Sequence, residues 1–434
     1  MRKILPLCKK IGITRISDIT FMDRLYIPNY SAILPGSEDS IWVYSGKGAS
    51  KLQAKVSALM EAIERYSSLP SSYPRSLIQG TFRELSKSYN KVLHPTEVIE
   101  PDNSAGDDNG DPIMDFLLGF DLLSNEEVLV PAEIALYRYF PRPPAVCAFS
   151  CSHTNGLASG NVIEESICHA LCEVIERDAA SIADLCASSI PYSILEGLTN
   201  WLENEIGEYS ISRIPGEEFV DDSSLFPDVD ISEIANEFGL IRGIVNRFAD
   251  AGINLLIKDI TQKDIGIPTF VASSVEWITN DYGYFAKGFG THPDARIALM
   301  RAITEVSQTR AANIQGARDD LKKIRYQQND EIFKRKWQFM PASSSRLSTQ
   351  KNDNIIKFSE IKSHIEKDVL QDINYILRGL KKAGLGRVII VDLTNPNIGI
   401  PTVRAIVPGL ETFEVTKKIM GGRAKKYFRN IYCS

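Results

Sequence analysis

The chain has 434 residues, of which 44% are hydrophobic, so it can bury a substantial core in one large domain or two to three smaller ones. Its formal net charge of −6 argues against general nucleic-acid binding. The sequence carries neither an apolar N-terminal leader nor an apolar run of membrane-spanning length, so we expect a cytoplasmic protein without a membrane segment. Seven cysteines, an odd number, fit reduced thiols better than a set of disulfides.

The N-terminal residues 1–44 are interrupted by prolines and a glycine and are expected to form an irregular arm. An apolar run at 41–44 predicts a strand that leads into the glycine turn 45–48, Ser-Gly-Lys-Gly. A helix is predicted over residues 51–68. Beyond a loop rich in proline and glycine, two short apolar runs predict a hairpin within residues 116–132.

A longer helix is predicted over Glu165–Arg177, which contains neither glycine nor proline. At about 100° per residue, Glu165, His169, Glu173 and Glu176 fall on one stripe of this helix. Like charges at helical spacing repel, so the stripe is unfavourable unless cations bind to it. Hard divalent ions such as Mg²⁺ take carboxylate oxygens and commonly carry substrate phosphates. For this helix alone, a solvated acidic face remains an equal alternative.

The pattern of this helix occurs at two other places in the chain. Residues 58–65 repeat residues 170–177 as Ala-Leu-x-Glu-x-Ile-Glu-Arg, whereas residues 298–305 keep the apolar frame but exchange the positions of glutamate and arginine. A glycine precedes the alanine of each copy by ten positions. A solvated surface gives no reason for such a repeat, but a shared site for a polyanion and its metal does. The polar residues of the copies are Glu61, Glu64 and Arg65, with Ser57 one turn earlier; Glu173, Glu176 and Arg177; and Arg301, Glu305 and Gln308.

A second repeat relates residues 251–269 to residues 383–402. Each unit predicts the end of a helix, a glycine cap, an apolar strand, an Asp-x-Thr turn and a return strand. We expect Asp259 and Asp392 to form turns rather than to act in catalysis. Together the repeats predict a pseudo-symmetric α/β fold with helices packed on antiparallel or mixed sheets. The spacing of the glycines excludes the Rossmann and P-loop phosphate sites.

Three other segments of the chain carry few recognisable motifs. Residues 191–238 are acidic and weakly patterned, and the basic stretches 322–336 and 414–434 are expected to be solvated faces rather than nucleic-acid sites. Two cysteine pairs, Cys147 with Cys151 and Cys168 with Cys172, make a zinc or iron–sulfur site conceivable, with His153 and His169 nearby. Their spacing is looser than Cys-x-x-Cys, so burial in the core is the favoured interpretation.

At these motifs the sequence resembles the YcaO superfamily, whose matching segments follow one another in the expected order over nearly the whole chain. A catalytic domain is therefore expected over residues 45–413. The segments that carry the resemblance are Ser45–Gly48, Ser57-x-x-x-Glu61-x-x-Glu64-Arg65, Asn155–Gly160, His169–Asp178, Glu305-x-x-Gln308-x-Arg310, Ile314-Gln-Gly-Ala-Arg318-Asp, Asp392-Leu-Thr and Pro408-Gly-Leu-Glu411.

The resemblance implies an enzyme that uses ATP and Mg²⁺ to phosphorylate the oxygen of a peptide backbone amide. It assigns the Mg²⁺ and, through it, the triphosphate to Glu61, Glu64, Glu165, Glu173 and Glu176. It assigns phosphate neutralisation to Arg65, Arg177 and Arg310, and the rest of the nucleotide site to Lys47, Ser57, Glu305 and Gln308. Catalysis would then depend on Glu173, Glu176 and Arg177, with His169 either transferring a proton or, as we favour, only supporting its neighbours through a hydrogen bond.

The nucleophile decides the product. A Cys, Ser or Thr side chain gives an azoline ring, and external sulfide gives a thioamide. The chain ends at Arg429–Ser434 without the proline-rich terminus of many ring-forming members, and no peptide-clamp domain precedes the core. We therefore expect a stand-alone thioamide-forming enzyme, similar to the archaeal members that modify methyl-coenzyme M reductase. Its implied partners are a peptide or protein substrate, a sulfur-delivery protein of the TfuA type and a second copy in a homodimer. An azoline-forming cyclodehydratase, a non-catalytic nucleotide-binding scaffold and a thiolate–metal or sulfur-carrier protein remain alternatives.

Overall fold

The computed structural model describes residue 1 and residues 3–35, 41–98, 111–146, 153–187, 226–232, 238–277, 282–315, 340–341, 347, 351–412 and 421–432. The predictions for Cys147 and Cys151, for residues 322–336 and for most of 191–238 lie outside these described residues. No helix in the described ranges is both long and apolar enough to cross a bilayer.

The N-terminal residues form an ordered layer. A short helix, α1 (Leu5–Ile11), leads into an antiparallel sheet of β1 (Arg15–Asp18), β2 (Asn29–Pro35) and β3 (Ile41–Lys47). The prediction of an irregular arm over residues 1–44 is therefore wrong, and β3 crosses the expected domain boundary. The prolines do not interrupt the sheet because Pro28 precedes β2 and Pro35 is its last residue.

Two larger sheets make up most of the described strands. In the first, the strand order is β12-β11-β10-β9-β8-β13, and all pairs are antiparallel except β8 with β13. In the second, the order is β4-β5-β14-β15-β7, with β6 paired to β5 in the predicted hairpin. The first sheet comprises β8 (Asp228–Asp230), β9 (Asn254–Asp259), β10 (Thr269–Trp277), β11 (Tyr282–Thr291), β12 (Met340–Pro341) and β13 (Ile355–Lys357). The second comprises β4 (Ile78–Gly80), β5 (Met114–Asp121), β6 (Glu126–Pro131), β7 (Leu157–Ser159), β14 (Ile389–Asp392) and β15 (Thr402–Ile406).

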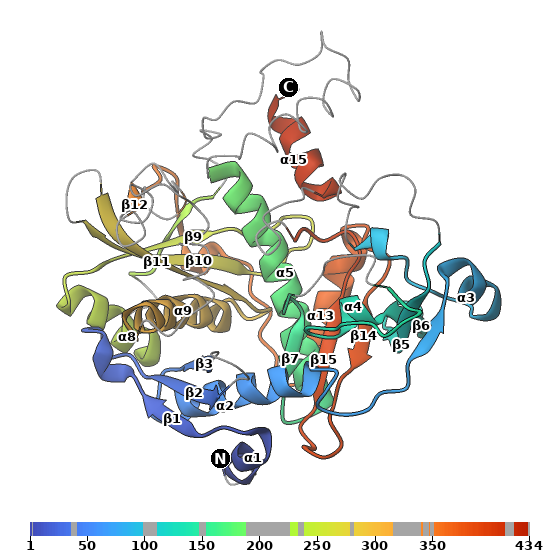
Figure 1. Cartoon of the computed structure of the whole chain (residues 1–434). Coiled ribbons are helices and arrows are strands. Elements are labelled where there is room, and N and C mark those ends of the chain that lie inside the picture. The colour runs from blue at the N-terminus through green and yellow to red at the C-terminus, as the bar shows by residue number, and fades with distance from the viewer. Residues whose placement is uncertain are drawn as a thin grey trace.

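One long helix, α5, lies between the two large sheets (Figure 1). It contacts β7 and β15 of one sheet, β10 and β11 of the other, and the helices α13 and α15. The predicted helix over residues 51–68 is confirmed as α2, with a Ser50–Gln53 capping box at its start. The helices are α2 (Lys51–Ser68), α3 (Phe82–Ser88), α4 (Ala132–Ala135), α5 (Ile163–Ala187), α8 (Gly239–Asp250), α9 (Ala295–Gln315), α13 (Val369–Lys382) and α15 (Gly422–Tyr432), with 3-10 turns at Thr20–Met22, Pro95–Glu97 and Phe358–Glu360.

The three predicted units of glycine turn plus helix are present as β3–α2, β7–α5 and β11–α9. In each unit the glycine segment lies against its own helix so closely that a side chain would not fit. A Cβ on Gly46 would lie 2.0 Å from the Ala58 amide nitrogen, and a Cβ on Gly290 would lie 2.0 Å from the Ala298 carbonyl oxygen. The Ala-Leu pair of every copy is completely buried, as the repeat predicts: Ala58 and Leu59, Ala170 and Leu171, and Ala298 and Leu299.

The two units of the second repeat also share their hydrogen bonds. In the first unit Asp259 accepts from the Thr261 amide at 2.9 Å, and the Thr261 hydroxyl accepts from the Thr269 amide at 3.0 Å. The corresponding distances in the second unit, for Asp392, Thr394 and Thr402, are 2.8 and 3.1 Å. The prediction that both aspartates form turns is confirmed. The mixed and antiparallel sheets likewise confirm the predicted α/β fold class.

Candidate active site

The first predicted carboxylate pair lies in the C-terminal part of α2. Arg65 Nη1 is 2.8 Å from Glu64 Oε1, and Arg65 Nη2 is 3.8 Å from Glu61 Oε1. Glu64 is buried, whereas 33% of the Glu61 side chain is exposed. Burial raises the pKa of Glu64 to about 8 despite the Arg65 charge, and the charges of Glu173 and Glu61 add to the rise. The contribution of Glu173 shows that the carboxylates of α2 and α5 share one electrostatic environment.

The second pair lies in the middle of α5. Glu176 is only 3% exposed, and Arg177 Nη2 is 3.8 Å from its Oε1. Burial and the charge of Glu305 raise the pKa of Glu176. Burial also raises the pKa of Glu173, against the charges of Arg177 and Arg65. The site therefore holds its carboxylates where solvent stabilises their charges poorly.

The third copy contributes Glu305 and Gln308 from α9, and both contact the first glycine turn. Lys47 of the first glycine turn forms an ion pair with Glu305, and the Gln308 side-chain amide donates to the Ser45 carbonyl. Burial acts to raise the pKa of Glu305, but the charges of Lys47 and Arg177 outweigh it and lower the pKa. These contacts bring the first glycine turn, α5 and α9 to one place, so the repeated helices converge as the sequence predicts.

Two buried atoms of this cluster have no hydrogen-bond partner among the described residues. Glu176 Oε2 has no hydrogen-bond donor and Arg301 Nε has no acceptor within the described ranges. Mg²⁺ takes carboxylate oxygens, and arginine is well suited to bind phosphate. The residues present therefore fit a Mg²⁺–triphosphate, because one orphaned atom matches the cation and the other matches the anion.

His169 lies on the same stripe of α5, one residue after Cys168. The residue is exposed to solvent, and its imidazole lies within the influence of the Arg301 and Lys47 charges. The charge of Arg301, together with burial and the charge of Lys47, lowers the pKa of His169 well below its ordinary value. The imidazole is therefore neutral at physiological pH and cannot act as the acid in a proton transfer without first taking up a proton.

Some predicted residues lie at other places or bind other partners. Glu165 is exposed in the first turn of α5, where its Oε2 accepts from the Asn161 amide at 2.6 Å. Ser57 is half-buried one turn before Glu61. Arg310 is 3% exposed, and its guanidinium lies 2.7 Å from Asp23 and 2.6 Å from Glu276. These ion pairs give Arg310 a structural part in the fold, and its assignment to phosphate remains a prediction.

The sequence interpretation did not identify Arg404 as part of the site. This residue of β15 is 1% exposed, and its Nη1 donates to the His153 carbonyl at 3.0 Å. Its charge lowers the pKa of Glu173, although burial prevails. An arginine in the otherwise apolar segment Thr402–Ile406 was the available signal, because a buried strand rarely carries a charge without a partner.

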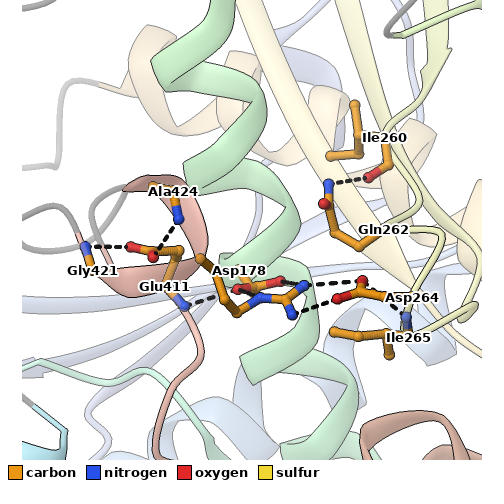
Figure 2. Close-up of polar contacts among 9 residues, drawn as sticks. Asp178, Ile260, Gln262, Asp264, Ile265, Glu411, Gly421 and Ala424 are labelled. Atoms are coloured by element: carbon orange, nitrogen blue, oxygen red, sulfur yellow. Dashed lines mark hydrogen bonds and ion pairs between the residues drawn. The ribbon is translucent and has the colours of Figure 1, made fainter. Parts of the chain in front are cut away.

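A second polar cluster lies on α5 directly after Arg177. Asp178 is completely buried and accepts from Arg423 Nε at 2.9 Å and from the Glu411 amide at 2.8 Å. Arg423 also reaches Asp264 at 2.7 Å. The Glu411 carboxylate accepts from the amides of Gly421 and Ala424 at the start of α15 (Figure 2). The cluster therefore fastens the C-terminal helix to α5 and to the turn that contains Asp264 (Figure 2).

Comparisons with known proteins show the family to which the chain belongs. A family profile for YcaO cyclodehydratases, described as ATP- and Mg²⁺-binding, matches residues 45–411. The match covers most of the chain, and the protein belongs to the YcaO family. ATP and Mg²⁺, the cofactors expected from the sequence, are thus confirmed as those of the family.

Two relatives resemble the chain over nearly its full length. A protein of Methanothermobacter thermautotrophicus, named only as uncharacterized, is 34% identical over 416 residues, which are 96% of this chain and 94% of that protein. A protein of Rhizobium leguminosarum bv. trifolii, named for its position in a tfuA 3′ region, is 30% identical over 414 residues, 94% of this chain and 86% of that protein.

Solved structures share the fold at lower identity. A heterocyclase in complex with substrate and cofactor gives a TM-score of 0.68 at 21% identity and covers 92% of this chain, which spans only 50% of that heterocyclase. YcaO from Methanopyrus kandleri, bound with AMPPCP and Mg²⁺, gives a TM-score of 0.62 at 20% identity. The match covers 96% of this chain and 91% of the Methanopyrus protein. Both comparisons support the fold class predicted from the repeats.

Proposed function

We propose that the protein uses ATP and Mg²⁺ to phosphorylate the oxygen of a peptide backbone amide, which sulfide then converts to a thioamide. The observation that supports the first half is the pair of orphaned atoms in the carboxylate cluster. Glu176 Oε2 is buried without a donor, and Arg301 Nε is buried without an acceptor in the described part of the chain. A metal–triphosphate would satisfy both atoms at once.

In this proposal the residues divide by charge. Glu61, Glu64, Glu173 and Glu176, with Glu165 at the start of α5, hold Mg²⁺, which supplies charge neutralisation for the phosphates. Arg65, Arg177 and Arg301 bind phosphate oxygens, and Lys47 and Gln308 hold the first glycine turn in place beside them. Donors positioned in advance are the main protein contribution to phosphoryl transfer, because they stabilise charge where it develops.

Phosphorylation solves a chemical problem of the amide. An amide carbon is a poor electrophile, and its oxygen leaves poorly. Once the oxygen carries a phosphoryl group, sulfide adds to the carbon and the oxygen departs as part of phosphate, so that a C=S bond replaces the C=O bond. Arg177 and Arg301 stabilise the phosphate as it leaves. The added SH group gives up its proton to the departing phosphate as the C=S bond forms, and His169 supports its neighbours through a hydrogen bond.

Sulfide as the nucleophile is supported by the relatives rather than by the site. The 34% identical relative comes from an archaeon, and the Rhizobium relative is named for a tfuA 3′ region. We propose a TfuA-type protein as the sulfur-delivery partner, with a peptide or protein such as methyl-coenzyme M reductase as the substrate. The alternative product is an azoline ring formed by a side chain of the peptide, in keeping with the cyclodehydratase description of the family.

The first test is calorimetry of Mg²⁺–ATP binding to the wild type, to Glu173→Gln and to Glu127→Gln. Glu127 is exposed on β6 and serves as a matched control for the loss of one carboxylate. We expect binding to be lost in Glu173→Gln and retained in the control, with circular dichroism confirming that both variants are folded. Equal affinity in all three proteins would show that the nucleotide does not bind at this cluster.

The second test separates the products. The protein is incubated with ATP, Mg²⁺, sulfide and candidate peptides, and the peptides are analysed by mass spectrometry. A thioamide appears as exchange of one oxygen for sulfur, and an azoline appears as loss of one water. Ring formation without any sulfur exchange would support ATP-dependent activation of the amide but would contradict the proposal that the product is a thioamide.

A further inference from the structure

Three metal-ligating side chains meet outside the carboxylate cluster. Cys168 comes from α5, His292 from the connection between β11 and α9, and Asp372 from the first turns of α13. One ligand atom of each residue lies within 4.8 Å of the ligand atoms of the other two. Among the described residues, this group of His, Cys and Asp side chains is close enough to hold a metal ion. The sequence interpretation considered a thiolate–metal site but associated Cys168 with His153 and His169 instead.

Cys168 and Asp372 are buried and His292 is half-buried, and the charge of the cluster is incompletely paired. Cys168 is 5% exposed and Asp372 is 8% exposed, and Asp372 Oδ1 has no hydrogen-bond donor in the part of the chain that the structure describes. A buried carboxylate oxygen without a donor is costly unless a cation or a proton accompanies it. A hydrogen bond with Cys172, opposed by burial and aided by His292, lowers the pKa of Cys168 and so favours the thiolate that metals bind.

The ligand set distinguishes this cluster from the nucleotide site. Thiolate sulfur, imidazole nitrogen and carboxylate oxygen are the three donors that Zn²⁺ uses, commonly in a tetrahedron completed by a fourth ligand. Mg²⁺ prefers oxygen donors alone, which the cluster of glutamates provides and this one does not. A borderline-soft divalent ion therefore matches the chemistry here.

One contact opposes coordination and must be weighed. The Asp294 amide donates to His292 Nδ1 at 3.0 Å, which places the ring proton of a neutral imidazole on Nε2. Coordination through Nε2 moves that proton to Nδ1 and ends this hydrogen bond. The loss of one exchangeable hydrogen bond is small beside the free energy of binding zinc to a thiolate site, so the contact lowers the affinity without preventing binding.

We propose that Cys168, His292 and Asp372 form a zinc site that ties α5 and α13 to the connection between β11 and α9. That connection belongs to the sheet of β10 and β11, whereas α13 packs beside α5 and leads into β14 of the other sheet. The metal would therefore join the two pseudo-symmetric halves of the fold. Because Cys168 directly precedes His169, it would also fix the segment of α5 that carries the glutamates of the nucleotide site.

The test uses the full-length protein, with excess Mg²⁺ present to occupy oxygen-only sites. Protein produced with zinc is dialysed and its metal content measured by mass spectrometry, and metal-free protein is titrated with Co²⁺. We expect one zinc per chain and, with Co²⁺, an absorption band of thiolate-to-metal charge transfer. The band should disappear in Cys168→Ser and remain in Cys8→Ser, because Cys8 is a buried thiol of α1 outside the cluster. Asp372→Asn should weaken Co²⁺ binding by at least about tenfold.

The wild type alone can overturn the proposal, whether or not any variant folds. Absence of retained zinc together with absence of the charge-transfer band would reject the site. A band that persists in folded Cys168→Ser would assign the metal to another cysteine. Unchanged Co²⁺ affinity in both Asp372→Asn and His292→Ala would reject the three-residue ligand set. None of these readouts depends on ATP binding or on peptide modification, so they are independent of the proposed reaction.

Discussion

Replacing Glu64 with glutamine removes one buried carboxylate while nearly preserving the volume of the side chain. The pKa of Glu64 is raised from 4.5 to about 8, chiefly by burial. In the unfolded chain the carboxyl loses its proton near its ordinary pKa, whereas in the folded, metal-free protein it keeps the proton until about pH 8. The free energy of unfolding therefore falls as the pH rises between these values, by about 5 kcal/mol for this one group.

The variant should lack this contribution. We expect the stability of Glu64→Gln relative to the wild type to rise with pH between about 5 and 8, by an amount approaching about 5 kcal/mol. The comparison is made by urea denaturation in EDTA at a series of pH values. Other titrating groups are present in both proteins and cancel in the difference, unless they interact with Glu64 directly. The exposed Glu127→Gln serves as the control and should show a flat difference.

The same variant should respond differently to ligand. Mg²⁺–ATP at about a hundredfold its Kd stabilises a folded protein by about 2.7 kcal/mol, and we expect this gain in the wild type but not in Glu64→Gln. A difference in stability that does not change with pH would refute the argument that burial disfavours the Glu64 charge. Equal stabilisation of both proteins by Mg²⁺–ATP would show that Glu64 does not help to hold the metal.

Three further substitutions test the packing around the site. In Gly46→Ala the new Cβ would meet the main chain of Ala58, so we expect a loss of about 3 kcal/mol in the free energy of unfolding, measured with urea; an unchanged midpoint would contradict the close approach. Arg310→Ala strands the buried Asp23 and should cost about 3–5 kcal/mol, whereas a role in phosphate binding alone would lower ATP affinity at unchanged stability. Arg423→Ala removes the partner of two aspartates and should increase hydrogen exchange in α15, an effect that would be absent if other contacts hold the helix.

Local signals explain why the repeated units could be predicted from the sequence. The helix over residues 51–68 has the predicted bounds because a Ser50–Gln53 capping box starts it and its apolar residues follow the helical period. The Asp-x-Thr turns at Asp259 and Asp392 form through hydrogen bonds that span only two to eight residues. Such features depend only on residues that are close together in the chain, so the sequence is enough to predict them.

What the sequence did not reveal is mostly contacts between distant residues. The N-terminal strands are an exception, because β2 pairs with its chain neighbours β1 and β3, and the prolines that suggested an irregular arm only flank or end β2. Arg310 follows Gln308 in a motif that suggests phosphate, yet its guanidinium binds Asp23, which lies 287 positions earlier in the chain. Arg404 and Arg423 are likewise explained by carbonyl or carboxylate partners in other segments. Charge pairing of this kind is a property of the folded chain and leaves little pattern in the sequence.

The exchange of charge in the third copy has an electrostatic reason that the structure makes visible. Three copies with two glutamates each would bring six carboxylates to one partly buried place, where burial already raises the pKa of Glu64, Glu173 and Glu176. Placing Arg301 at the position of the first glutamate supplies a cation beside His169 and Glu176, and Glu305 is neutralised by Lys47. In the proposed site the first two copies thus provide the glutamates for the metal, and the departure from symmetry in the third copy adds Arg301 to the arginines for phosphate.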